Sequence, residues 1–372
     1  MKIEFVDLHA QYLTIKPEID NAIADVISKS AYIRGPYVEK FEKEYSALFG
    51  VNHCISCGNG TDSLYIAMRA MGVGPGDEVI TTAHSWISTS ETVTQTGARV
   101  VFADTDPDSY TIDPLEIEKK VTAKTKCIIP VHLYGQPADM DPIMKIADQH
   151  GLSVLEDCAQ AHLARYRGRI TGTIGRVGSF SFYPGKNLGA YGDAGAVITN
   201  DTDLARTMTC LARHGGLKKG EHEIEGINSR LDGLQAAILS VKLNYLRKWT
   251  SARQKIAATY NQQLEGVGDI VVPKLMPNRD HVYHLYVIRT SFRDALADYL
   301  KSAGIQTVIN YPVALPFLKA YRYLGHNEND FPVAFRSQST ILSLPIFPEM
   351  TDEMVAYVVK TLQSFFEGKC SK

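Results

Sequence analysis

The sequence lacks the features by which membrane-spanning and secreted proteins are recognised. No apolar run approaches the length needed to cross a bilayer. The opening segment MKIEFVDLHAQY carries Glu4 and Asp7 among its apolar residues, so it has no uninterrupted apolar core of the kind found in signal peptides. Six cysteines in 372 residues do not suggest a disulfide framework. We therefore expect a cytoplasmic protein that does not bind a membrane.

Metal-binding patterns are scarce. Cys54 and Cys57 form a C-x-x-C pair, which occurs in redox sites and in half-sites for zinc. No second C-x-x-C and no paired-histidine motif completes a zinc site. Because both cysteines fall in a segment typical of a buried strand, we interpret them as core residues and expect no bound metal.

An excess of charge of one sign is also absent. Lysine and arginine number 39 and aspartate and glutamate number 41, which gives a formal net charge of −2. A protein that binds a polyanion such as DNA usually shows a basic excess, so we expect no nucleic-acid partner. A balance so close to zero does not keep copies of the chain apart, and self-association is compatible with it.

The first 250 residues contain short apolar strands that alternate with amphipathic helices. We expect strands at His53–Cys57, Glu78–Thr81, Arg99–Ala103, Cys127–Val131, Ser153–Leu155, Val177–Tyr183 and Ala194–Thr199. We expect helices at 17–29, 36–49, 61–71, 86–96, 114–121, 141–150, 201–213 and 232–247. This alternation predicts an α/β fold with a large, mostly parallel sheet covered by helices on both faces.

The pattern changes near residue 250. One more helix is expected at 250–264, after which Pro273 and Pro277 interrupt the periodicity. A strand at His281–Arg289, a helix at 292–303, a strand at 305–309 and a terminal helix at 351–366 are expected beyond them. We therefore predict a large domain at 1–250 and a smaller α+β domain at 251–372.

Ligands of open α/β sheets bind beyond the carboxyl ends of the strands, and four features of the sequence fall there. Gly58-Asn59-Gly60-Thr61-Asp62 joins a strand to a helix start, which suits a phosphate but is also compatible with a plain turn. Asp157 ends an apolar strand, where it could bind a metal, act as a base, pair with a cationic ring nitrogen or cap a helix.

The other two features are Lys186 and Trp86. Lys186 follows a strand on a Pro-Gly turn, where partial desolvation would make its amine nucleophilic, although a solvated loop lysine is the commoner case. Trp86 begins a helix and could cover a flat ring or belong to the core. Together the four features supply what pyridoxal phosphate (PLP) requires, namely a phosphate cup, a carboxylate, a stacking ring and a lysine.

The sequence resembles the DegT/DnrJ/EryC1/StrS sugar aminotransferases over nearly its whole length. The matching segments include FVDLHAQY, CGNGTDSL, GVGPGDEVITT, PVHLYGQPADMDPI, EDCAQAH, SFSFYPGKNLGAYGDAGAV, ARHGG, NSRLDGLQAAIL, HVYHLYVIR and LSLPIFP. The resemblance implies the aspartate-aminotransferase fold with a PLP cofactor. It also implies a homodimer with two shared active sites.

The resemblance also implies a role for individual residues. Lys186 would hold the cofactor and then move protons, and Asp157 would pair with the pyridine nitrogen. The remaining implied cofactor contacts are Gln160 at the ring hydroxyl, Trp86 on the ring face, and Gly60, Thr61 and Ser181 at the phosphate. Asn228 matches the position that reaches the phosphate of the neighbouring subunit's cofactor.

Amino transfer from L-glutamate to a nucleotide-linked keto sugar is the implied reaction. PGKNLGAYGDAG looks most like members that act at C3 of dTDP-linked 3-keto-6-deoxyhexoses. Alternatives are a UDP-linked 3-keto uronic acid and a 4-keto sugar. Lys186 disfavours a PLP-dependent sugar dehydratase, whose relatives carry histidine there, and Lys186 with Asp157 disfavours a non-catalytic sensor. An NAD-dependent dehydrogenase fits less well because Gly58–Gly60 lacks the G-x-G-x-x-G spacing.

Substrate contacts are less well defined by the sequence. The candidates are His162, Tyr183, Arg213, His214, Arg230, Asn310 and Tyr311. Three positions depart from the family pattern: Asn310 and Pro316 stand where histidine is usual, and Leu163 stands where glycine is usual. The first two departures lie near the expected substrate site and leave the identity of the sugar open.

Overall fold

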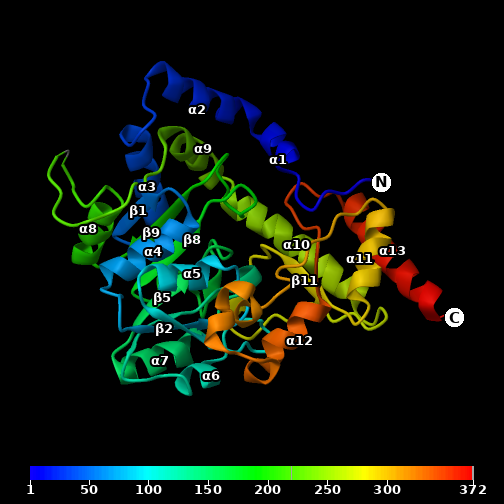
Figure 1. The fold of residues 1–372 in the computed structure, drawn as a ribbon. Coiled ribbons are helices and arrows are strands. Elements are labelled where there is room, and N and C mark those ends of the chain that lie inside the picture. The colour runs from blue at the N-terminus through cyan, green and yellow to red at the C-terminus, as the bar shows by residue number, and fades with distance from the viewer. Residues whose placement is uncertain (219, 371–372) are drawn as a thin grey trace.

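The computed structural model describes residues 1–218 and 220–370 and is built around one seven-stranded sheet (Figure 1). In spatial order its strands are β1 (His53–Cys57), β9 (Gly195–Thr199), β8 (Val177–Ser181), β5 (Ser153–Asp157), β4 (Thr125–Ile129), β2 (Glu78–Thr82) and β3 (Arg99–Ala103). The β9 strand runs antiparallel to both of its neighbours, and the other pairings are parallel. The expected α/β fold with a large, mostly parallel sheet is therefore confirmed.

Helices cover both faces of this sheet. One face packs against α4 (Gly60–Ala70), α5 (Ser88–Gln95) and α8 (Thr202–Leu211). The other face packs against α3 (Pro36–Phe49), α9 (Gly233–Leu243), α6 (Pro114–Glu118) and α7 (Met140–His150). The two N-terminal helices, α1 (Leu8–Thr14) and α2 (Lys16–Ser28), lie outside this layer, and α2 packs against α9. Burial on both faces explains why the strands are almost continuously apolar.

A second hydrophobic cluster forms beyond the sheet. It gathers side chains of α10 (Leu246–Leu264), β11 (Tyr286–Arg289), α11 (Arg293–Ser302), β12 (Ile341–Leu344) and α13 (Asp352–Cys370). Ile3 belongs to the same cluster and pairs with Ile305, so the start of the chain packs with its C-terminal third. The expected domain boundary at residue 250 falls inside the continuous helix α10, which leads from one cluster to the other (Figure 1). The division into two domains stays a prediction.

The segment between α11 and β12 packs back against the sheet. It contains the 3₁₀ turns η2 (Leu315–Phe317), η3 (Lys319–Leu324) and η4 (Glu328–Asp330), and then α12 (Pro332–Thr340). Leu315, Tyr321 and Phe331 pack into the cluster beneath α4 and α5. Asp104, just after β3, accepts hydrogen bonds from the backbone N–H groups of Val333 and Ala334, each at 2.9 Å. This carboxylate fixes the start of α12 against the sheet edge.

The expected elements differ from the structure mainly after residue 230. The expected helix 232–247 ends at Leu243, and α10 begins at Leu246. Residues 305–309 make isolated bridges rather than a named strand. The expected strand at His281–Arg289 is shortened to β11. The remaining elements are η1 (Leu133–Gly135), β6 (Arg165–Tyr166), β7 (Arg169–Ile170) and β10 (Arg279–Asp280). Within the described residues, no helix is long and apolar enough to cross a membrane.

Candidate active site

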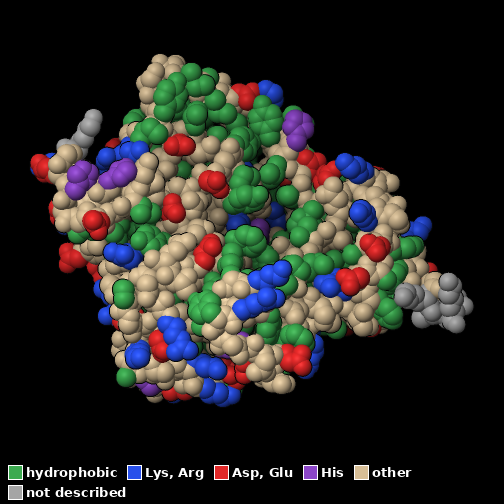
Figure 2. All heavy atoms as spheres, in the orientation of Figure 1, with side chains coloured by type: hydrophobic (Ala, Val, Ile, Leu, Met, Phe, Trp, Pro, Cys, Tyr) green, Lys and Arg blue, Asp and Glu red, His purple; other side chains and the backbone are tan. Residues whose placement is uncertain are grey.

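A cavity of about 840 Å³ opens at the carboxyl ends of the central strands. The cavity is lined by residues of the sheet, of the starts of α4 and α5, of α10 and of the N-terminal segment. Asn310 and Tyr311 also line it. Figure 2 shows a hollow on one face of the molecule, with Lys or Arg and His side chains visible at its floor. The cavity therefore lies where ligands of such sheets are expected.

Asp157 provides a buried carboxylate in this wall. It ends β5 and is 5% exposed. Its Oδ2 accepts a hydrogen bond from Thr89 Oγ1 at 2.8 Å, and its Oδ1 accepts one from the backbone N–H of Ala159 at 3.1 Å. Burial raises the pKa of Asp157, against the influence of these donors and of Lys186. A cation placed against Asp157 would therefore favour the ionised carboxylate.

Lys186 lines the same cavity. The turn that carries it follows β8 and is closed by a hydrogen bond from its own backbone N–H to the carbonyl of Tyr183, at 2.8 Å. Burial lowers the pKa of the Lys186 amine to about 8, although Asp157 acts in the opposite direction. A larger share of the amine is consequently neutral near physiological pH than in a solvated lysine, and a neutral amine is a nucleophile.

The cavity end near α4 is shaped to receive a phosphate. Gly60 begins α4, and its Cα faces Ser181 so closely that an added Cβ would lie 2.6 Å from Ser181 Cβ. Thr61 Oγ1 lies 2.7 Å from Ser88 Oγ, so two hydroxyls and a helix start gather at one point. Free N–H groups and the positive helix end favour a bound anion there.

Aromatic and amide groups form the remaining wall. Trp86 is 58% exposed, and its ring lies 5.5 Å from that of Tyr311 between centroids. Gln160 accepts a hydrogen bond from the backbone N–H of Tyr134 at 2.6 Å and donates one to Tyr311 Oη at 3.1 Å. The pyridine ring of PLP needs a carboxylate at its nitrogen, an aromatic face and a phosphate cup, and the residues present fit this group.

The sequence profile of the DegT/DnrJ/EryC1/StrS aminotransferase family matches residues 13–363. This chain belongs to that family. Its aminotransferases use PLP, in agreement with the expected cofactor. The fold and the enzyme class expected from the resemblance are likewise confirmed.

Three relatives are similar to this aminotransferase over nearly its full length. The "pleiotropic regulatory protein" of Geobacillus stearothermophilus is 48% identical and covers 98% of this chain and 99% of its own. The dTDP-3-amino-3,4,6-trideoxy-alpha-D-glucose transaminase of Streptomyces venezuelae is 42% identical, covering 98% and 97%. The UDP-2-acetamido-2-deoxy-3-oxo-D-glucuronate aminotransferase of Pseudomonas aeruginosa is 41% identical, covering 97% and 99%.

Solved structures are similar in fold as well as in sequence. Streptomyces venezuelae DesV, in complex with a ketimine intermediate, superimposes with a TM-score of 0.97 at 42% identity, covering 98% of this chain and 99% of that one. Bacillus subtilis NtdA, with bound cofactor PMP, gives a TM-score of 0.91 at 31% identity, covering 98% and 85%. Neither superposition assigns a substrate to the present aminotransferase.

Not all of the expected site residues line the cavity of their own chain. Gly60, Thr61, Trp86, Asp157, Gln160, Ser181, Tyr183, Lys186, Asn310 and Tyr311 do so. His162 is fully buried beside them, where Tyr45 Oη lies 3.0 Å from its Nδ1 and its Nε2 donates to the Ser181 carbonyl at 3.0 Å. Both ring nitrogens are thus occupied, and the placement supports a role in positioning Ser181.

The other expected residues lie on the segments around α8 and before α9. Arg213 forms an isolated bridge with Asn228, and His214 and Asn228 are exposed while Arg230 is half-buried. Ser229 ties this segment to the phosphate end, because its Oγ accepts a hydrogen bond from the Gly58 N–H and donates one to Asp62. The exposed Asn228 is therefore held next to the loop that begins α4 without lining the cavity itself.

The sequence reasoning missed three residues that shape the site. Thr89 holds Asp157, and His84 Nε2 accepts a hydrogen bond from the Tyr311 N–H at 3.0 Å. Arg253, on α10, also lines the cavity. Thr89 stands one helical turn after Trp86, which is a usable signal. His84 lies 227 positions from Tyr311 in the sequence, and Arg253 lies within an ordinary helical pattern. The local sequence around these two residues therefore gives no signal of a role in the site.

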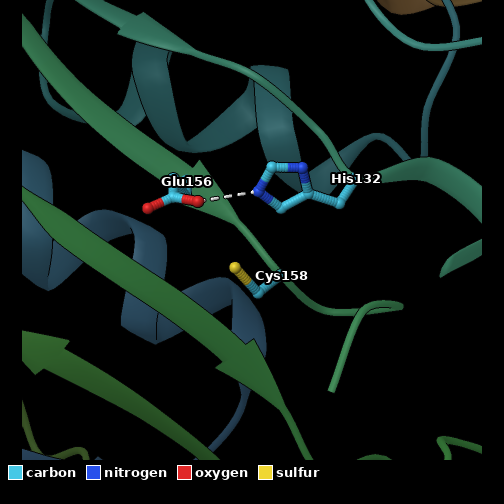
Figure 3. Close-up of side chains that lie close together, drawn as sticks. All are labelled: His132, Glu156 and Cys158. Carbon is cyan, nitrogen blue, oxygen red and sulfur yellow. Dashed lines mark hydrogen bonds and ion pairs between the residues drawn. The ribbon is translucent and has the colours of Figure 1, made fainter. Parts of the chain in front are cut away.

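His132, Glu156 and Cys158 gather on the opposite side of β5 (Figure 3) and have a donor set that a metal could use. Glu156, however, accepts hydrogen bonds from His132 and from the backbone N–H groups of Gly172, Ile174 and Gly175, at 2.7–2.9 Å. His132 Nδ1 accepts a further one from Ala138. These contacts occupy the carboxylate and the imidazole, so the cluster holds the loop after β7 rather than serving the cavity.

Proposed function

We propose that this aminotransferase exchanges an amino group between L-glutamate and the keto group of a nucleotide-linked hexose, with a dTDP-linked 3-keto-6-deoxyhexose as its acceptor. The observation that carries the proposal is that the buried Asp157 carboxylate and the Lys186 amine, whose pKa is lowered by burial, line the same cavity. The similarity to transaminases whose names specify dTDP-3-amino sugars supports the choice of acceptor.

PLP, when bound, supplies an aldehyde that captures amines and a ring that withdraws electrons. Asp157 would hold the ring nitrogen, and its buried carboxylate would keep that nitrogen protonated. Lys186 Nζ would hold the aldehyde carbon until an amine displaces it. The freed Nζ would take a proton from the amine-bearing carbon of the donor and pass it to the former aldehyde carbon, and it would move a proton in the reverse direction, onto the acceptor carbon, in the second half of the cycle.

The mouth of the cavity suits a substrate with a large exposed part. Tyr183, which unlike Trp86 is not assigned to the cofactor ring, is 60% exposed and lines the opening. A large ring at a solvent-facing rim can stack against a base or a sugar. A hexose would then reach Lys186 while the nucleotide lies toward the rim. In a dimer, Arg213, His214 and Arg230 of the partner subunit would be available to bind the nucleotide there.

We further propose a homodimer that acts in the cytoplasm. Asn228 is exposed and does not reach its own cavity, which supports the implied contact with the partner's cofactor phosphate. The five cysteines among the described side chains are buried and unpaired, as in proteins of reducing compartments.

The first experiment is a pair of half-reactions. Protein loaded with PLP is mixed with L-glutamate, and the visible absorbance of the bound cofactor is followed while 2-oxoglutarate is quantified. Loss of the band with one equivalent of 2-oxoglutarate is expected. Lys186→Ala should show neither change, whereas Lys145→Ala, on the exposed surface of α7, should behave as the unaltered protein.

The second half-reaction identifies the acceptor. The aminated enzyme is offered a dTDP-linked 3-keto-6-deoxyhexose, a UDP-linked 3-keto uronic acid and a dTDP-linked 4-keto sugar in parallel. The first should restore the absorbance band fastest. A faster response to the uronic acid would replace the proposed acceptor with that of the Pseudomonas relative.

A regulatory function is the second candidate, because the Geobacillus relative is named as a regulatory protein. It predicts PLP binding without release of 2-oxoglutarate from any amino donor tested. That result would overturn the proposed catalysis while leaving the cofactor assignment in place.

A further inference from the structure

Arg253 is a buried cation in the catalytic cavity that the proposed chemistry does not yet use. It lies on α10, is 3% exposed and lines the cavity together with His284 and Ile346. The other charged side chains that line this cavity are Asp62, Asp157, Asp193 and Lys186. None of the ion pairs among the described residues includes Arg253. An unpaired buried charge is costly, so a ligand that brings an anion to it is favoured.

The hydrogen bonds of Arg253 leave one edge of the guanidinium free. Nη1 donates to the backbone carbonyls of Tyr283, His284 and Ile346 at 3.3, 3.4 and 2.7 Å. Nε is buried and has no partner, and none of the hydrogen bonds among the described residues uses Nη2. Nε and Nη2 form the side of a guanidinium that pairs with both oxygens of a carboxylate. The three carbonyls hold the group still while this side remains available.

Arg253 and a second buried cation share one acidic neighbour. Glu349 is the acidic neighbour, and it acts on both Arg253 and the buried Lys242, so two cations share one carboxylate. Burial raises the pKa of Glu349, and its Oε2 has no hydrogen-bond partner. His284 lies within the electrostatic reach of both Lys186 and Arg253, and burial together with these cations lowers its pKa. A neutral His284 adds no further positive charge to the cavity, so Arg253 is the cation that an incoming anion meets on this side.

We infer that Arg253 is a carboxylate-binding residue for the substrate that reacts at Lys186. This inference rests on the proposed function and adds a recognition site to it. The favoured source is L-glutamate, because each complete cycle brings its carboxylates next to Lys186. The C6 carboxylate of a uronic acid acceptor is the second source with the same chemistry. The nucleotide phosphates fit less well, because Arg253 is buried and the nucleotide requires the open rim.

The test uses binding as well as turnover, so that it does not depend on the proposed reaction. Succinate carries two carboxylates but no amine or keto group, and succinamide is its uncharged counterpart. Calorimetric titration of the PLP-loaded protein should show succinate binding and much weaker succinamide binding. Arg253→Lys should weaken succinate about 10-fold, because it keeps the charge but loses the two-pronged contact, and Arg253→Gln should weaken it about 100-fold.

Arg279→Lys is the matched control. Arg279 is also buried, at 8% exposed, and donates through Nη1 to a backbone carbonyl, that of Pro137 at 3.0 Å, but it does not line the cavity. This control should bind succinate as the unaltered protein does. Thermal midpoints and the absorbance of bound PLP are recorded for each variant. If Arg253→Gln does not fold, Arg253→Lys carries the test.

Half-reactions then distinguish the two carboxylate sources. A rise confined to the half-saturating concentration of L-glutamate assigns the site to the amino donor. A rise confined to a uronic acid acceptor assigns it to that acceptor. Unchanged succinate binding in a folded Arg253→Lys variant would overturn the inference, as would equal losses of cofactor binding and of both half-reactions. A protein that binds succinate through Arg253 yet never converts L-glutamate would refute the proposed function and retain the carboxylate site.

Discussion

Burial acts in opposite directions on the two ionisable groups that define the cavity. It raises the pKa of the Asp157 carboxyl and lowers that of the Lys186 amine, so both neutral forms are favoured. A bound cationic ring reverses the effect at Asp157 and restores its negative charge. A bound charge of opposite sign therefore offsets the cost of burying the ionised Asp157 carboxylate. The same reasoning applies to Arg253, whose charge persists because a guanidinium does not deprotonate near neutral pH.

The amine of Lys186 gives a prediction on pH. Its pKa of about 8 means that the neutral amine predominates above pH 8 and declines below it. The rate at which the cofactor-free protein captures PLP should fall about tenfold per pH unit below that value and level off above it. Stopped-flow absorbance between pH 6 and pH 10 would measure this (both limits are about two units from the expected midpoint). A midpoint near the ordinary lysine value would contradict the burial argument.

Gly60 gives a prediction on shape. Gly60→Ala would place a Cβ 2.6 Å from Ser181 Cβ, so the start of α4 and Ser181 would have to separate. PLP affinity should fall on the order of tenfold, which corresponds to the cost of modest overpacking. Gly74→Ala is the matched control, because its Cβ would meet only the Thr96 carbonyl at 3.9 Å. Equal cofactor affinity in the two variants would argue against close packing at the phosphate end.

Site residues that follow strands could be predicted from the sequence, and those on other elements could not. Asp157 and Lys186 were identifiable because a polar residue at the end of a buried strand, or in the turn that follows it, must lie at the sheet edge. His84 and Arg253 reach the site by long-range packing that no local pattern records. His162 was expected to bind substrate, but both of its ring nitrogens are occupied by contacts with Tyr45 Oη and the Ser181 carbonyl.

At the scale of elements, the strands of the sheet were predicted best. Burial on both faces makes them short, uninterrupted apolar runs, and the turns between them are rich in glycine. The C-terminal third was predicted less well. The strand β12 and the helix α12 are specified by what they pack against, and the break between α9 and α10 has no proline or glycine to mark it.

The junction between β3 and α12 gives a prediction on stability. Asp104 accepts hydrogen bonds from two N–H groups of α12 and is 5% exposed, so Asp104→Ala would leave buried donors unsatisfied. The unfolding free energy should fall by about 1–3 kcal/mol, measured by urea titration. Asp201→Ala removes the cap of α8 at a more exposed position and should cost about 1 kcal/mol or less. A larger loss for Asp201→Ala would show that α12 is held by other contacts.

At the scale of the whole molecule, the exposed Asn228 makes the proposed dimer testable. Lys186→Ala and Asn228→Ala chains should each be strongly impaired alone. In a mixed dimer, one cavity combines the intact Lys186 of one chain with the intact Asn228 of the other. Unfolding and refolding the two variants together should therefore recover activity, whereas refolding each separately should not. Absence of recovery, with dimers verified by native mass spectrometry, would contradict shared active sites.

The pairing of Ile3 with Ile305 has a practical consequence for anyone who produces this enzyme. The backbone of Ile3 exchanges hydrogen bonds with Gly304 and Gln306, and Phe5 and Val6 line the cavity only a few residues later. An affinity tag or fusion partner joined before Ile3 would thus begin within a short linker's reach of the reaction site. Such an addition would be able to cover the cavity mouth and so alter the measured kinetic constants. A tag joined after α13 avoids this segment, and comparing the two versions would reveal such an artefact before any mutant is interpreted.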